Sequence, residues 1–123
     1  MLKAMRLPSE RDDDLALLDV MIEALDKVQR YTAEVTPEAF LASTLVQDAV
    51  ALNFLVVGEC ANHLTDFAKA QTEAPWPQIV SLRHRIAHGY QFVDRMTIFG
   101  LATDDADALR TALLTLRERL DAD

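Results

Sequence analysis

The stretch AVALNFLVVGEC, residues 49–60, decides the fold. It is apolar nearly all round the circumference of the helix it would form, apart from a few polar positions. A helix that is apolar on every side is buried on every side. In a chain of 123 residues, this pattern predicts a central helix with other helices packed around it. Some of its surface is also expected to meet a second subunit.

The interruptions in and beside this run have simple structural interpretations. Gly58 costs a helix about 1 kcal/mol relative to Ala, so we expect it to mark a close contact between two helices. Asn53, Glu59 and His63 are interpreted as satisfied buried or interfacial polar groups rather than catalytic residues. Cys60 is the one cysteine of the chain, and in such surroundings a buried, inert thiol is expected.

Before the central stretch, the pattern predicts one long amphipathic helix. Leu15, Leu18, Ile22, Leu25 and Val28 repeat at steps of three and four residues, which is typical of a helix with one buried face. This helix is expected over about residues 11–33.

The next start signal is the sequence TPE at residues 36–38, with a capping hydroxyl, a proline and an acid. A short helix through Phe40 is expected there, followed by the long central helix from about Ser43 to Lys69.

Downstream, prolines and capping residues divide the rest of the chain. The sequence PWP at residues 75–77 breaks the central helix and opens the next one. That helix should end near Gly89, where we expect the left-handed conformation of a helix cap. Asp94 is expected to cap a last helix, which is predicted to be broken or kinked at residues 103–105.

Together these elements predict an all-α protein: an up-and-down bundle of four main helices with short loops. No strand alternation is evident, and Gly and Pro number only 3 and 4. We expect a flexible tail over residues 1–8 and a single domain over residues 9–123. A single Cys suits a reducing cytoplasm. With no apolar run of about 20 residues, no membrane-spanning segment is expected.

Charge is unevenly distributed along the chain. The formal net charge of −8 argues against a general nucleic-acid binder, because phosphate contacts need Lys and Arg. No Lys or Arg occurs between Thr32 and Ala68, whereas a cationic cluster follows within thirteen positions: Arg83, His84, Arg85, His88 and Arg95. A local cationic surface on an acidic protein suits a short phosphate segment or an acidic partner.

The densest part of this cluster is SLRHRIAHGY, residues 81–90, which contains two of the three histidines. If it is helical, Arg83 and His88 point roughly 140° apart, whereas His84 and His88 share a face. Three interpretations follow. The two histidines could chelate Zn²⁺; the arginines could pair with acids while the histidines pack; or the segment could act on a phosphodiester.

In the phosphodiester hypothesis, His88 takes or gives a proton near neutral pH. Arg83 holds a phosphate by two parallel hydrogen bonds and stabilises charge in the transition state. Tyr90 projects its hydroxyl into the same opening. In a symmetric dimer with this helix near the two-fold axis, Arg83 of one subunit could approach His88 of the other.

The sequence Arg83-x4-His88-x-Tyr90 resembles the Rx4HxY motif of HepT-type toxins in the HEPN superfamily. The resemblance extends over about residues 10–120 and includes further matches in the same order: residues 47–50, 58–61, 75–76, 82–83, 88–90 and 93–94.

This resemblance implies a helical bundle that dimerises, with a metal-independent endoribonuclease site at the dimer cleft and no cofactor. His88 would be the acid and base and Arg83 the phosphate stabiliser, acting on an RNA 2′-hydroxyl and phosphate to leave a cyclic phosphate end. The system implied is a type VII toxin–antitoxin pair of the HepT/MntA type. In it a small nucleotidyltransferase of the MntA type neutralises the toxin and in some members adenylylates the motif tyrosine, here Tyr90.

Two positions depart from the family pattern. His84 stands where Asn usually follows the motif arginine, so it is expected to support the site or to alter its chemistry. Phe99 is the nearest aromatic residue to a position that is usually Trp, and it is interpreted as a core residue. The presence of His84 instead of Asn and the net charge of −8 favour an alternative function. In this alternative the chain is a non-catalytic HEPN subunit that binds and assists a partner nucleotidyltransferase.

Overall fold

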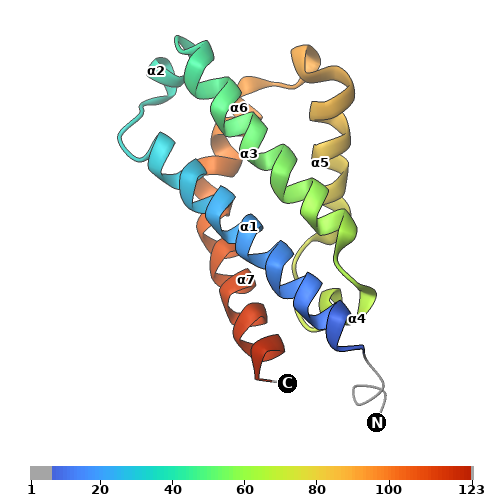
Figure 1. Cartoon of the computed structure of the whole chain (residues 1–123). Helices are drawn as coiled ribbons and strands as arrows, with labels where there is room; N and C mark the ends of the chain where they lie inside the picture. Colours follow the sequence, from blue (N-terminus) through green and yellow to red (C-terminus); the bar gives the residue numbers. More distant parts are fainter. Residues whose placement is uncertain (1–6, 123) are drawn as a thin grey trace.

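The computed structural model describes residues 7–122, and in this part of the chain all regular structure is helical. Four long helices form the body: α1 (Pro8–Thr32), α3 (Thr44–His63), α5 (Trp76–Gly89) and α7 (Ala106–Asp121). In Figure 1, α1 and α5 run in one direction and α3 and α7 in the other. The prediction of an all-α bundle with four main helices is confirmed.

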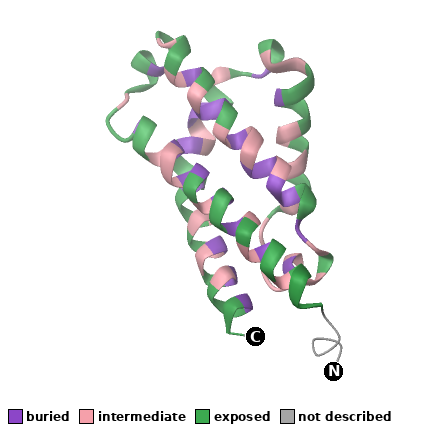
Figure 2. Cartoon of the chain, viewed as in Figure 1, coloured by how far each residue is buried: buried purple, intermediate pink, exposed green. Residues whose placement is uncertain are grey.

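Helix α3 is the central element, as residues 49–60 predict. It packs against α1 on one side and α5 on the other, while α1 also packs against α7. Buried residues lie along the inner faces of the helices (Figure 2). The largest fully buried apolar ones are Leu18, Met21, Leu25, Val28, Phe40, Val50, Val57, Ile98, Leu113, Leu116 and Leu120.

Helix α5 contributes least to this core. Its one buried residue is Ile86, although Ile79 and Leu82 pack against the core while partly buried. Half of its residues are exposed, including five of the SLRHRIAHGY segment: Ser81, His84, Arg85, Ala87 and His88.

The first helix begins earlier than expected. Pro8 is its first residue, within the predicted tail, and residues 1–6 of that tail lie outside the described part of the chain. The helix start is tied to the end of the chain, because the Arg11 guanidinium donates to the carbonyl oxygens of Leu120 (3.1 Å) and Asp121 (2.9 Å).

The expectation of one central helix through Lys69 is wrong. Helix α3 ends at His63, and a short helix α4 (Asp66–Lys69) follows. Leu64 is extended, and the Thr65 hydroxyl accepts from the Ala68 amide to cap α4. The buried carboxylate of Asp14 accepts from the Thr65 amide (3.0 Å) and hydroxyl (2.7 Å). A long-range contact with α1 thus ends α3, and local periodicity does not reveal such a contact.

The expected break in the last helix is confirmed. This helix is divided into three segments: α6 (Arg95–Gly100), a π-helical turn at Leu101–Asp105, and α7. The Asp94 carboxylate accepts from the Met96 amide and caps α6, as predicted. Short helix α2 (Pro37–Leu41) carries the expected Thr36 cap.

Helix α3 has the length and apolar composition of a membrane span, with 20 residues and a mean hydropathy of 1.3 in its most apolar window. It is the single helix of this kind within residues 7–122. The packing of both α1 and α5 against it is that of a core helix in a globular bundle.

Candidate functional site

The position of α5 depends on Gly58 in the middle of α3. A Cβ atom at Gly58 would clash with Cβ of Arg83 and would lie 3.0 Å from the carbonyl oxygen of Ile79. The predicted close contact at this glycine is therefore present, and Arg83 is the residue that occupies the space. The contact turns the base of the Arg83 side chain toward α3.

Arg83 forms an ion pair with Glu59 one residue further along α3. Its Nε and Nη2 atoms each lie 2.7 Å from Glu59 Oε2, and Glu59 Oε1 is 3.2 Å from His63 Nε2. The hydrogen bond from His63 and the Arg83 guanidinium lower the pKa of Glu59. Glu59 and His63 are thus satisfied polar groups, as expected, but His63 is exposed rather than buried. Arg83 has the acidic partner considered in one of the three interpretations.

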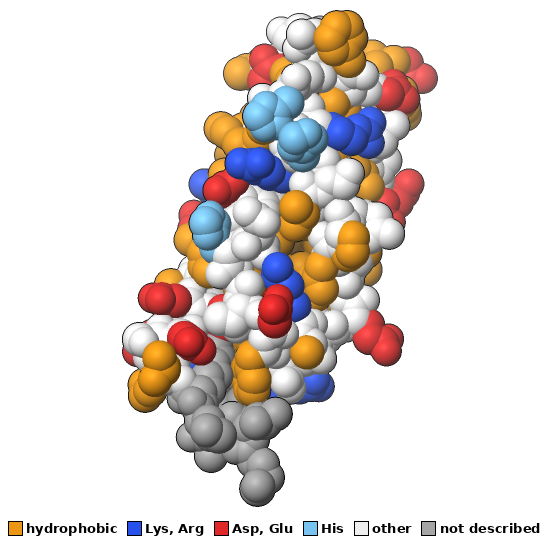
Figure 3. Space-filling model, turned by 90° about the vertical axis from the view of Figure 1, so that its right-hand side faces the viewer, with side chains coloured by type: hydrophobic (Ala, Val, Ile, Leu, Met, Phe, Trp, Pro, Cys, Tyr) orange, Lys and Arg blue, Asp and Glu red, His pale blue; other side chains and the backbone are white. Residues whose placement is uncertain are grey.

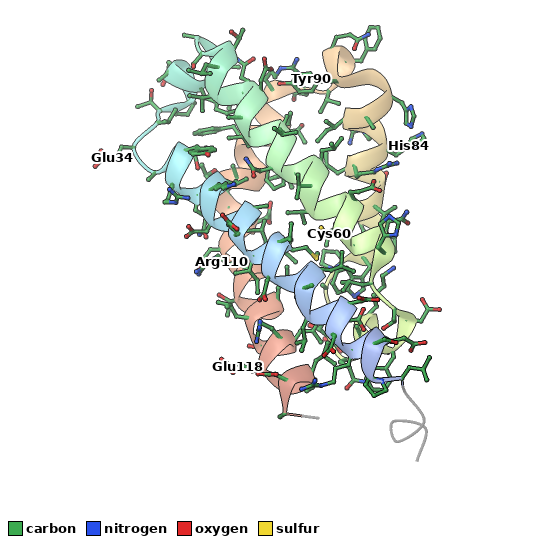
Figure 4. The ribbon with its side chains drawn as sticks, in the orientation of Figure 1. Glu34, Cys60, His84, Tyr90, Arg110 and Glu118 are labelled. Atoms are coloured by element: carbon green, nitrogen blue, oxygen red, sulfur yellow. The ribbon has the colours of Figure 1, made fainter. Side chains whose placement is uncertain are left out.

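His84 and His88 lie on the outer face of α5 and are both exposed. Their ring centres are 4.5 Å apart with an interplanar angle of 47°, so the prediction that they share a face is correct. Neither ring makes a hydrogen bond or ion pair within residues 7–122, in contrast to His63. Figure 4 shows His84 pointing away from the bundle, and Figure 3 shows His and Lys or Arg side chains gathered on this face.

Tyr90 opens the 3₁₀ turn Tyr90–Phe92 that follows α5. Its hydroxyl donates to Asp48 Oδ1 at 2.6 Å, and the ring packs toward the core between the end of α5 and α3 (Figure 4). Burial and the hydrogen bond to Asp48 raise the pKa of Tyr90 to about 12. The hydroxyl is therefore held protonated and fixed in direction at neutral pH.

Arg95 holds the tyrosine from the other side. Its guanidinium carbon lies 4.0 Å from the centre of the Tyr90 ring, and Nη1 donates to the carbonyl oxygens of Tyr90 (2.9 Å) and Val93 (2.7 Å). Nε donates to Gln47 Oε1 at 3.3 Å. Arg95 was expected in the cationic cluster, but these contacts make it a support for the turn.

The expected left-handed cap at Gly89 is wrong. Its φ is −174°, which is extended backbone. A Cβ atom there would lie 3.7 Å from the Phe92 ring, an ordinary contact. The chain leaves α5 through the 3₁₀ turn, so a left-handed residue is not needed.

The structure gathers the predicted residues into two neighbouring groups. Arg83 turns toward α3, whereas His84 and His88 lie together on the exposed face, as the spacing of five residues predicts. The sequence did not predict the supporting contacts of three residues: Glu59 with Arg83, Asp48 with Tyr90, and Arg95 with the turn after α5. Asp48 and Glu59 fall within the segments that match the family pattern, which was the available signal.

Two further features surround α5. An apolar groove of about 700 Å³ lies beneath the helix, toward α3 and α7. It is lined by Phe54, Val57, Pro75, Pro77, Gln78, Ile79, Ser81, Leu82, Arg85, Thr97, Leu101, Asp105, Ala106 and Leu109. Phe92, just past the motif, is 85% exposed.

The Cys60 thiol is buried, and burial raises its pKa, which agrees with an inert cysteine.

Comparison with known proteins identifies the family of the chain. A family model described as "Ribonuclease HepT-like" matches residues 21–116. "Probable ribonuclease HepT" of Thermococcus cleftensis is 26% identical over 102 residues, which cover 82% of this chain and 93% of the relative. "Putative RNase MJ1380" of Methanocaldococcus jannaschii is 23% identical over 103 residues, 83% of this chain and 94% of the relative.

A third relative is longer than this chain. "Gamma-glutamylcyclotransferase and putative RNase MJ0434", also of Methanocaldococcus jannaschii, is 26% identical over 112 residues, which cover 90% of this chain and 50% of that protein. No solved structure matches. Because the family model spans most of the described bundle, including α5 and its Arg83-x4-His88 segment, the chain belongs to the ribonuclease HepT-like family.

Proposed function

We propose that this HEPN-type ribonuclease is the toxin of a type VII toxin–antitoxin pair and that it cleaves RNA in the cytoplasm without a metal. The observation that carries the proposal is the uncommitted imidazole of His88 on the exposed face of α5. It lies in the same motif as a fixed guanidinium, Arg83, and a fixed hydroxyl, Tyr90.

In the proposed reaction, the RNA 2′-hydroxyl attacks the adjacent phosphorus and the bond to the 5′ oxygen breaks. A 2′,3′-cyclic phosphate and a free 5′-hydroxyl result. His88 takes the proton of the attacking hydroxyl or gives one to the leaving oxygen, as an imidazole can near neutral pH. The Arg83 guanidinium stabilises the negative charge that builds on the phosphoryl oxygens.

The two residues are proposed to meet across a homodimer. Within one chain Arg83 turns toward α3 and His88 faces outward, so a second subunit on the exposed face of α5 would bring the partner's arginine to this histidine. The weakly buried α5 supports this arrangement. Nη1 of Arg83, which makes no hydrogen bond or ion pair within residues 7–122, would hold the phosphate while Nε and Nη2 remain on Glu59.

Tyr90 is proposed as the target of the antitoxin, a minimal nucleotidyltransferase of the MntA type. Its hydroxyl oxygen would attack the α-phosphorus of ATP, which forms the O-adenylyl ester and releases pyrophosphate. Asp48 already accepts the phenolic hydrogen bond at 2.6 Å and would receive the proton. The added negative charge and bulk beside His88 would exclude RNA from the site.

The activity is tested with purified protein, RNA and EDTA. We expect cleavage to persist in EDTA, with cyclic phosphate ends identified by mass spectrometry. His88→Ala should lower the rate by about 10²–10⁴-fold, and Arg83→Ala by about 10²–10³-fold. Arg30→Ala is the matched control, because this arginine is exposed, lies on α1 and pairs with Asp26, away from the Arg83–Glu59–His63 contacts. Equal rates in wild type and His88→Ala would refute the proposal.

Neutralisation is tested by intact-mass measurement after co-expression with a neighbouring nucleotidyltransferase. A mass gain of one or more adenylate groups that is lost in Tyr90→Phe supports modification at Tyr90. An unchanged mass together with a tight complex would replace modification by plain binding.

One observation favours a second function. Arg83 is already paired with Glu59, and His84 stands at the position usually occupied by Asn, so the chain could instead serve as a non-catalytic subunit that binds and assists a nucleotidyltransferase. In that case the transferase is active only in the complex, and expression of this chain alone causes no growth defect. Growth arrest that depends on His88 would exclude this alternative.

A further inference from the structure

His84 and His88 have the spacing in the sequence that a pair of metal-binding histidines on a helix requires. They lie four residues apart on one face of α5, both are exposed, and their ring centres are 4.5 Å apart. Two imidazoles bound to one Zn²⁺ through Zn–N bonds of ~2.0 Å have ring centres roughly 4.5–5.5 Å apart. Small side-chain rotations at the surface would therefore bring both rings onto one metal ion.

Both rings are free of competing contacts. Neither makes a hydrogen bond or ion pair with residues 7–122, whereas the ring of His63 contacts Glu59 at 3.2 Å. Neutral imidazole is a good ligand for Zn²⁺, Ni²⁺ and Cu²⁺.

We propose that His84 and His88 bind one divalent transition-metal ion per chain and that the bound ion blocks His88. The ion would be coordinated by the lone pair of the His88 imidazole that otherwise accepts a proton. Within residues 7–122 no group of three or more His, Cys, Asp or Glu side chains could hold a metal. Water would fill the remaining coordination positions, and the ion would be weakly held and removable by chelators, as an inhibitor rather than a cofactor.

The binding half of this proposal is tested without any activity measurement. Untagged full-length protein is titrated with ZnCl₂ and, separately, NiCl₂ by calorimetry, and the histidine side-chain NMR signals are followed. Wild type and the matched control His63→Asn should each bind one ion per chain. The signals of His84 and His88 should shift, and that of His63 should not. His84→Asn should bind roughly tenfold or more weakly. Circular dichroism should show an unchanged fold, because His84 is exposed.

The blocking half rests on the proposed ribonuclease function and is measured separately. Saturating Zn²⁺ should stop RNA cleavage by wild type and by the control Arg30→Ala, and EDTA should restore it. No binding, or equal binding by wild type and His84→Asn, would overturn the site. Binding without inhibition of an active enzyme would overturn the blockade. A protein that binds Zn²⁺ at this pair but never cleaves RNA would refute the proposed function and leave the metal site standing.

Discussion

Gly58 and Arg83 lie in direct contact where α3 packs against α5, and this contact brings the guanidinium of Arg83 to Glu59. A Cβ atom on Gly58 would occupy the position of the Arg83 side chain and would lie 3.0 Å from the backbone oxygen of Ile79. Backbone atoms cannot move aside as the end of a flexible side chain can. The glycine therefore sets how closely the helix that carries the motif approaches the central helix.

Gly58→Ala should destabilise the protein. Alanine improves helix propensity by about 1 kcal/mol, but overpacking at a close contact costs about 1–3 kcal/mol and also separates Arg83 from Glu59. We expect a net loss of roughly 1–2 kcal/mol in the free energy of unfolding, measured by urea denaturation. Gly100→Ala is the matched control, because a Cβ atom there has no neighbour within 4 Å. It should be neutral or stabilising, and an equal loss in both variants would contradict this account.

The sequence predicts the bundle because its strongest signals are periodic. Residues 49–60 are apolar all round and form the central helix, and the three- and four-residue steps from Leu15 to Val28 form α1. Caps with local hydrogen bonds, at Thr36 and Asp94, also occur as predicted. These helices and caps depend on residues that are close in the sequence, so they can be predicted from a single sequence.

Features that depend on distant residues were missed. The end of α3 follows from Asp14, which lies 51 positions from Thr65, and the roles of Asp48 and Glu59 come from contacts with Tyr90 and Arg83 across the bundle. The extended backbone of Gly89 is a local feature that was also not predicted, because the 3₁₀ turn directly after it was not expected. Among the site residues, helical spacing alone predicts the shared face of His84 and His88 and the different direction of Arg83.

Asp14→Asn should lower stability markedly. The Asp14 side chain is fully buried and accepts from both the amide and the hydroxyl of Thr65. An amide offers one acceptor oxygen and turns a donor toward a group that needs an acceptor. Imperfect satisfaction of a buried polar group costs about 1–3 kcal/mol. Asp13→Asn, at an exposed position, should change the free energy of unfolding by less than about 0.5 kcal/mol. Similar values for the two variants would show that the α1–Thr65 contact does not stabilise the fold.

Glu59→Gln should reduce the loss of stability in acid. The pKa of Glu59 is lowered from its ordinary value of 4.5 by the hydrogen bond with His63 and by Arg83. A carboxylate with a lowered pKa in the folded state stabilises the fold above the pKa of the unfolded state. That contribution is lost as the pH falls through the folded value. Wild type should therefore lose more stability than Glu59→Gln below about pH 4.5, as followed by thermal unfolding at a series of pH values. Parallel pH profiles would show that the Arg83–Glu59–His63 contacts do not persist in solution.

Tyr90 should ionise at unusually high pH, and Asp48 should be one cause. The two tyrosines of the chain are Tyr31 and Tyr90, so Tyr31→Phe leaves one phenol for an absorbance titration. Burial and the hydrogen bond to Asp48 raise the pKa of Tyr90 to about 12. Asp48→Asn in the same background removes the negative charge and should lower this pKa part of the way toward 10, while the contribution of burial remains. The raised value also means that the neutral tyrosine stabilises the fold below pH 10, and this contribution is lost as the pH rises through 12. A Tyr90 pKa that is the same with Asp48 and with Asn would mean that the hydroxyl is not held by Asp48. The proposed proton acceptor for adenylylation would then have to come from the partner nucleotidyltransferase.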